Sequence, residues 1–77
     1  MNLDHLVHMA NRIAEFFEAM PDHAEACEGV AQHLQRYWEP RMREALREHV
    51  LTGGGAGLRP LVVEAVRSRL TTPSAAG

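Results

Sequence analysis

Lysine is absent from this sequence, and cysteine, tryptophan and tyrosine each occur once. A single cysteine excludes a disulfide within the chain, and an unpaired thiol is more typical of a reducing cytoplasm than of an oxidising compartment. No apolar run approaches the roughly 20 residues that are needed to span a bilayer. Asp4, Arg12 and Glu15 interrupt the early apolar positions, so no signal-peptide core is evident. We therefore expect a cytoplasmic chain without a membrane segment.

The charges are nearly balanced, with eight arginines against ten acidic residues and a net charge of −2 when the histidines are neutral. This balance argues against a nucleic-acid-binding protein that relies on bulk positive charge. The exclusive use of arginine has two explanations that stay open. One is a GC-rich genome that favours arginine codons, and the other is a use of planar, weakly hydrated guanidinium groups in interface ion pairs.

The length of 77 residues allows one domain. A domain of this size buries only about 60–65% of the surface that its unfolded chain exposes, so its stability margin is thin. Small domains without disulfides need a metal, very good packing or a partner. Stability that depends on a partner protein is therefore one of the options for this chain.

Apolar residues recur with helical spacing in four segments, which are separated by prolines and glycines. We expect helices over residues 3–19, from Asp22 to a break at Glu39-Pro40, from Pro40 to the glycines at 53–57, and from Pro60 to about residue 70. The predicted fold class is all-α: a small bundle of three to four short helices. Residues 1–70 are predicted to form a single helical domain and residues 71–77 a disordered tail.

Local signals define the ends and faces of these helices. Asn2 and Asp22 are suited to cap helix N-termini, and Gly53 is suited to the left-handed position at a helix C-terminus. The glycines that follow are expected to form a flexible linker or loop. Gly29 inside the second helix indicates a close approach of another helix, with sequence drift as the alternative. The expected inner faces of the second and fourth helices contain Ala24, Cys27, Val30, Ala31, Leu34 and Trp38, and Leu61, Val62, Ala65, Val66 and Leu70.

The residues that could carry chemistry do not form a complete set for any reaction. His5 and His8, with Asp4 near them, and the pair His23 and Cys27 have ligand spacing on a helix, but a metal site needs three or four ligands. The glycine segment lacks the Lys-Ser/Thr of a phosphate-binding loop. We therefore assign no catalytic, cofactor-binding or metal-binding residue.

The most informative segment is residues 37–43, Tyr-Trp-Glu-Pro-Arg-Met-Arg, at the corner between the second and third helices. Tyrosine, tryptophan and arginine are enriched at the centres of protein–protein interfaces. The large apolar residues also exceed what a small core readily absorbs, although the alternative that they all lie inside stays open. The predicted partner-binding residues are Phe16, Tyr37, Trp38, Pro40, Arg41, Met42 and Arg43.

Several segments together resemble a known family. They are the opening Leu-Val-His-Met-Ala-Asn-Arg-Ile-Ala at 6–14 with Phe16-Phe17, the break at Pro21, and residues 31–34 leading into 37–43. Over roughly residues 3–67 the chain resembles the small delta subunit of cytoplasmic NAD-dependent, molybdenum- or tungsten-containing formate dehydrogenases. The string Trp-Glu-Pro-Arg-Met-Arg is the most specific part of this resemblance.

The resemblance implies a non-catalytic accessory subunit of a hetero-oligomeric enzyme, with no nucleic acid and no membrane as partner. In that family a large subunit carries the metal–pterin cofactor and iron–sulfur clusters, and other subunits carry FMN and react with NAD. None of these cofactors is expected on this chain, since one cysteine cannot hold a four-cysteine cluster. The chain is expected to dock on the large subunit and to support assembly or stability.

Two other readings stay open on the sequence alone. The chain could be a self-associating helical regulator or adaptor that buries its apolar surplus across a two-fold axis. It could also be a module that responds to pH or metal through its five histidines.

Overall fold

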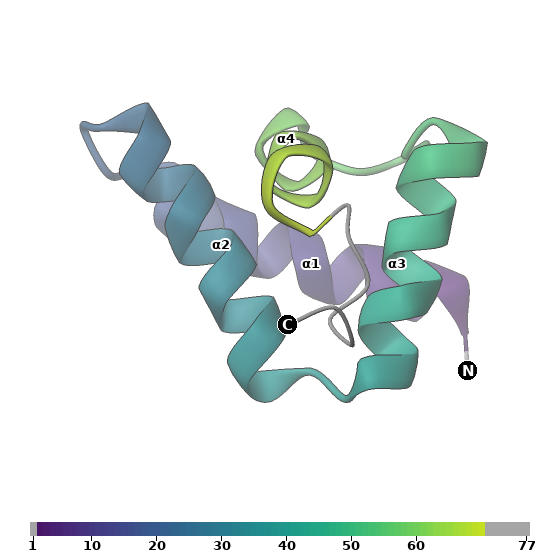
Figure 1. Ribbon diagram of the computed structural model, residues 1–77. Helices are drawn as coiled ribbons and strands as arrows, with labels where there is room; N and C mark the ends of the chain where they lie inside the picture. The colour runs from purple at the N-terminus through teal and green to yellow at the C-terminus, as the bar shows by residue number, and fades with distance from the viewer. Residues whose placement is uncertain (1, 71–77) are drawn as a thin grey trace.

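A computed structural model describes residues 2–70, which form four α-helices and, within that range, no strand (Figure 1). The helices are α1 (Leu3–Phe17), α2 (His23–Tyr37), α3 (Pro40–Gly53) and α4 (Pro60–Arg69). The predicted all-α bundle is therefore confirmed. The tail predicted at 71–77 lies outside the described residues.

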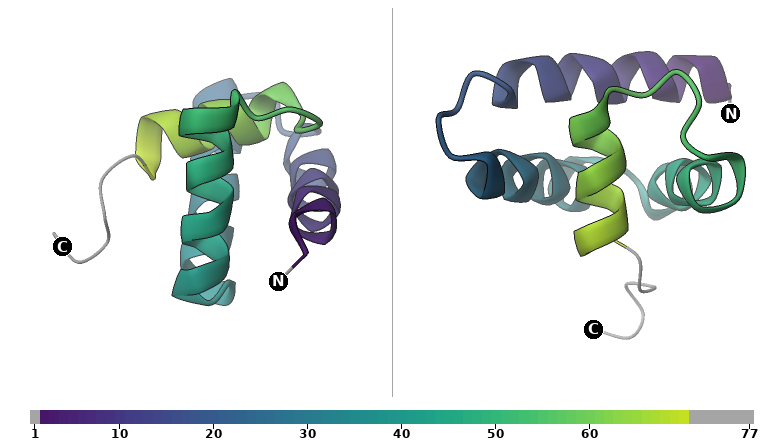
Figure 2. Two further views of the ribbon diagram at one scale, coloured as in Figure 1. Left: turned by 90° about the vertical axis from the view of Figure 1, so that its right-hand side faces the viewer. Right: turned by 90° about the horizontal axis from the view of Figure 1, so that it is seen from above.

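The four helices enclose one core from different directions. In Figure 1, α2 and α3 form two arms that meet at the bottom of the view, α4 lies between the arms and is seen nearly end-on, and α1 crosses behind them. Figure 2 shows from above that α4 runs across the direction of α1. Every pair of helices is in contact, and α4 packs chiefly on α2. The last helix therefore closes the core that the first three leave open.

The starts of the helices follow the local signals of the sequence. The Asn2 side chain accepts a hydrogen bond from the His5 backbone N–H at 3.3 Å, and the Asp22 side chain accepts one from the Glu25 N–H at 3.1 Å. Both side chains satisfy N–H groups that have no partner inside the helix, as predicted. Helices α3 and α4 each begin with a proline, whose fixed φ suits the first helical position.

The ends of α1 and α3 differ from the prediction by one or two residues. Helix α1 ends at Phe17, before the predicted Ala19. Gly53 is the last residue of α3, and the left-handed residue is Gly54, with a φ of 74°. The expectation for Gly53 was therefore wrong by one position, because several glycines in a row leave the exact end of a helix undetermined.

The loop between α3 and α4 has a defined conformation and is held to α1. The side-chain amide of Asn11 donates to the Gly57 carbonyl at 3.0 Å, and its oxygen accepts from the Arg59 backbone N–H at 2.9 Å. Gly55 and Gly57 adopt positive φ values of 73° and 84°. The glycines thus form an ordered turn, where the sequence suggested a flexible linker or loop.

The core is built mostly from small and branched aliphatic side chains, with Trp38 as its largest member. The inner face of α2 differs from the prediction at its start, since Ala26 is buried and the predicted Ala24 is exposed. All five predicted inner residues of α4 and its end are buried. The buried set is Leu6, Ala10, Ala14, Ala26, Cys27, Val30, Ala31, Leu34, Trp38, Leu46, Val50, Leu61, Val62, Ala65, Val66 and Leu70.

The close approach predicted from Gly29 is present between α1 and α2. A Cβ atom at this position would lie 2.4 Å from a ring carbon of Phe17, well inside van der Waals contact. The ring of Phe17 therefore needs the space that a glycine leaves on α2. This contact fixes the side of α2 against which the end of α1 packs.

Candidate functional site

The corner between α2 and α3 contains both buried and exposed residues. Trp38 follows the last residue of α2 in an extended conformation, with a ψ of 141°. This change of direction turns the indole inward, where only 5% of the residue is exposed. In the isolated chain Trp38 therefore belongs to the core and offers almost no surface to a partner.

Arg43 supports the same corner from the first turns of α3. One of its guanidinium nitrogens, Nη1, donates to the Trp38 carbonyl at 2.6 Å and to the Gln35 carbonyl at 3.1 Å, and lies 3.5 Å from the Leu34 carbonyl. The last carbonyls of a helix lack partners within it, and a cation at that end is favourable. Arg43 thus caps α2 and fixes the angle between α2 and α3.

The other predicted partner-binding residues are more accessible. Phe16 and Tyr37 are 74% and 70% exposed. Pro40 and Arg41 are exposed at the start of α3, and Met42 is half-buried against the core. The structure therefore divides the predicted set into exposed side chains and side chains that hold the corner. Whether any of them contacts a partner stays a prediction.

The aromatic rings of α1 and α2 form two pairs, Phe16 with Phe17 and His33 with Tyr37, and we call these four residues the aromatic face. The Phe16 and Phe17 rings meet edge to face with their centroids 5.1 Å apart, and the His33 and Tyr37 rings are 4.8 Å apart. A shallow hollow of about 190 Å³ is lined by Phe17, Gly29, Gln32, His33, Arg36 and Tyr37, and thus by one ring of the first pair and both rings of the second. The aromatic face therefore combines apolar rings with a guanidinium at its edge.

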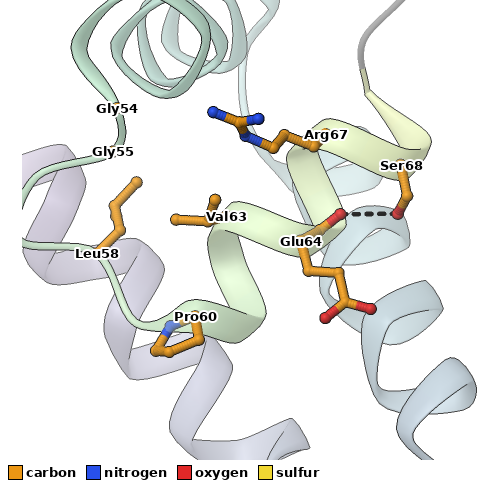
Figure 3. Close-up of a pocket in the computed structure, with 8 residues that line it drawn as sticks. All are labelled: Gly54, Gly55, Leu58, Pro60, Val63, Glu64, Arg67 and Ser68. Atoms are coloured by element: carbon orange, nitrogen blue, oxygen red, sulfur yellow. Dashed lines mark hydrogen bonds between the residues drawn. The ribbon is translucent and has the colours of Figure 1, made fainter.

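A larger open hollow of about 570 Å³ lies between the glycine turn and α4 (Figure 3). Leu58 and Val63 give it an apolar floor, and Arg67 extends along its rim. The Ser68 hydroxyl donates to the Glu64 backbone carbonyl at 2.7 Å, so it is engaged within α4. The Glu64 carboxylate, which also belongs to this lining, lies 2.8 Å from the His23 imidazole nitrogen.

His23, Cys27 and Glu64 come together between α2 and α4. The Nε2 atom of His23 lies 2.8 Å from a carboxylate oxygen of Glu64, and the imidazole nitrogen, the Cys27 Sγ and the carboxylate oxygen all lie within 4.8 Å of one another. In Figure 3 the carboxylate points away from Leu58 and Val63. The spacing of His23 and Cys27 was visible in the sequence, whereas Glu64 was not, because it lies on another helix.

Cys27 is fully buried, while His23 and Glu64 are exposed. Burial raises the pKa of the Cys27 thiol, and the nearby carboxylate of Glu64 adds to this effect. The hydrogen bond from His23 lowers the pKa of Glu64. A buried thiol with a raised pKa stays protonated to a higher pH than an exposed one.

The other candidate ligands, His5, His8 and Asp4 on α1, do not form a comparable cluster. All three side chains are exposed. Among residues 2–70, the group of His23, Cys27 and Glu64 is the one in which three ligand atoms converge. The first histidine pair therefore has ligand spacing without a third ligand.

None of the four described helices is long and apolar enough to cross a membrane.

A family model described as the NADH-dependent formate dehydrogenase delta subunit, FdsD, matches residues 5–66 of the 77-residue chain. The match covers most of α1, all of α2 and α3, and most of α4. No significant match was found among curated proteins or among solved structures.

Proposed function

We propose a docking role for this chain, which belongs to the FdsD family of NADH-dependent formate dehydrogenase delta subunits. In this proposal it is a non-catalytic subunit that docks on the large metal–pterin subunit of a cytoplasmic complex. In this role the chain supports assembly or stability of the enzyme. The metal–pterin, iron–sulfur, FMN and NAD chemistry belongs to the other subunits. The family membership is the observation that carries this proposal.

The exposed aromatic side chains support a docking role. Phe16 and Tyr37 are the most exposed of the large hydrophobic residues among residues 2–70. Aromatic side chains bury large areas when a partner covers them and are enriched at interface centres. Their ring contacts with Phe17 and His33 hold them in place, which lowers the entropy lost on binding. We therefore place the main contact on the aromatic face.

The corner residues have two roles in this proposal. Tyr37 and Arg41 are exposed and act as direct contacts, together with Pro40 beside them. Trp38 and Arg43 act indirectly, because they fix the direction of α3 relative to α2. Substitutions in the first group should weaken docking without unfolding the chain, and substitutions in the second should affect both.

Co-purification from the native cytoplasm tests the docking role. A tagged chain should recover the large subunit in stoichiometric amount, together with formate-dependent NAD reduction. The paired substitution of Phe16→Ala with Tyr37→Ala should lower this recovery. Leu51→Ala is the matched control, since Leu51 is an exposed apolar residue outside the aromatic face with 43% exposure.

The same experiment distinguishes the alternatives. Equal recovery by the paired variant and by Leu51→Ala would place the contact elsewhere on the chain. Recovery of the chain alone, together with a dimer in sedimentation, would contradict the docking role and favour self-association through the same aromatic face.

A further inference from the structure

We propose that His23, Cys27 and Glu64 form a binding site for a divalent transition-metal ion, with Zn²⁺ as the expected occupant. The site lies between α2 and α4 and does not include the aromatic face. It is independent of the docking role, because it can be tested on the chain alone.

The positions of the three side chains suit a single ion. Zinc bonds of about 2.0–2.3 Å to nitrogen, oxygen and sulfur place tetrahedral ligand atoms about 3.3–3.7 Å from one another. The three ligand atoms here lie within 4.8 Å of one another. The closest pair, the His23 nitrogen and the Glu64 oxygen at 2.8 Å, would have to separate slightly. Because both side chains are exposed, their rotation can make these small adjustments without moving the core.

The backbone holds the ligands in a suitable arrangement. His23 and Cys27 are four residues apart on α2, so their side chains lie on the same side of the helix, one turn apart. Glu64 comes from α4, the helix that packs most closely on α2. A site built from two packed helices is already largely formed before an ion arrives, which reduces the cost of ordering its ligands.

The donor set favours zinc over the harder cations. One imidazole, one thiolate and one carboxylate form a mixed nitrogen, sulfur and oxygen set, whereas magnesium and calcium prefer oxygen ligands alone. Three protein ligands leave the fourth tetrahedral position for water. The exposure of His23 and Glu64 places that position toward solvent, and the buried Cys27 closes the other side.

The surroundings of Cys27 are compatible with a metal thiolate. The thiol loses its proton to solvent when the sulfur–metal bond forms, and the cation then compensates the charge of the sulfur inside the core. Burial and the Glu64 carboxylate raise the pKa of the free thiol, and the positive charge of Arg69 opposes them only in part, so the ion must displace the thiol proton. Arg69 is held in place by Glu28, whose carboxylate accepts its hydrogen bond at 2.7 Å.

Titration of the purified full-length chain with Co²⁺ and Zn²⁺ tests the site directly. We expect one Co²⁺ per chain, with a thiolate-to-cobalt charge-transfer band that Zn²⁺ abolishes. Competition with a chromophoric chelator then gives the Zn²⁺ affinity. Glu64→Gln should weaken it by at least about tenfold, since even the outer-shell partners of metal ligands contribute 10–100-fold.

The variants separate metal binding from folding. Glu64 is exposed, so Glu64→Gln should keep the circular dichroism of the native chain; Cys27→Ser should lose the charge-transfer band. His8→Gln is the matched control, since His8 is an exposed histidine outside the cluster, and it should leave the Zn²⁺ affinity unchanged. Absence of stoichiometric binding, a cobalt spectrum without the thiolate band, or equal affinities for Glu64→Gln and His8→Gln would overturn the proposal.

Discussion

Replacing Trp38 by alanine should destabilise the chain by about 3–5 kcal/mol, the usual cost of truncating a buried tryptophan or phenylalanine. The side chain belongs to the core cluster, and the residue is 5% exposed. A domain of 77 residues has a total stability of about 4–12 kcal/mol at the usual 0.05–0.15 kcal/mol per residue. The substitution therefore removes at least about a quarter of the stability, and at the lower end of that range it unfolds the chain.

Urea unfolding followed by far-ultraviolet circular dichroism measures this effect, because the helix signal does not depend on the indole that is removed. Tyr37→Ala is the matched control. Tyr37 precedes Trp38 in the sequence but is 70% exposed, so its truncation should change the free energy of unfolding by no more than about 0.5 kcal/mol. The two neighbouring aromatic residues should thus differ clearly in their effect on stability.

An unchanged urea midpoint for Trp38→Ala, with an unchanged slope, would refute the reasoning from burial. If the same variant also failed to join the formate dehydrogenase complex, Trp38 would be a direct interface residue, as the composition of the corner suggested. A large loss of stability for Tyr37→Ala would equally contradict the exposed position of that ring.

Three further predictions concern the packing and the surface of the bundle. The hydrogen bonds from Arg59 lower the pKa of Glu18 in the folded chain below its ordinary 4.5. As the pH falls through that value, the unfolded chain therefore binds more protons than the folded chain, and the free energy of unfolding decreases. The difference between urea midpoints at about pH 7 and about pH 4 should therefore shrink in Glu18→Gln. Gly29→Ala should destabilise the chain by about 1 kcal/mol, because the clash with Phe17 exceeds the gain in helix propensity. In a Phe17→Ala background the same change should stabilise it by about 0.5–1 kcal/mol, as measured by urea unfolding. Arg43→Gln should cost about 1.5–3 kcal/mol in the same assay, through loss of charged hydrogen bonds to the end of α2, and Arg43→Lys should restore part of this.

The parts of the fold that depend on local chemistry were predictable from the sequence. Asn2 and Asp22 cap their helices because the acceptor and the N–H group are three residues apart in the chain. Prolines at 40 and 60 begin helices for a similarly local reason. The inner face of α4 followed from its helical period alone.

The parts that depend on tertiary packing were not predictable in the same way. Helical periodicity placed Trp38 on the inner face of the second helix, where it is buried, but it did not predict the extended conformation of this residue just beyond α2. The role of Asn11 in holding the loop and that of Arg43 in capping α2 depend on groups from other segments of the chain. Glu64 joins His23 and Cys27 only because α4 packs on α2. The sequence therefore predicted which residue types belong to the candidate partner-binding site, whereas the fold determines which of these residues are exposed.

The attachment of the glycine turn to α1 has a consequence for protein engineering. A run of glycines between two helices looks like a natural place to insert a tag or a fluorescent domain. Here the turn needs positive φ values at Gly54, Gly55 and Gly57, and Asn11 binds both Gly57 and the backbone of Arg59. An insertion would separate these groups and release the start of α4 from α1. The most linker-like segment of this sequence is therefore a poor site for a fusion.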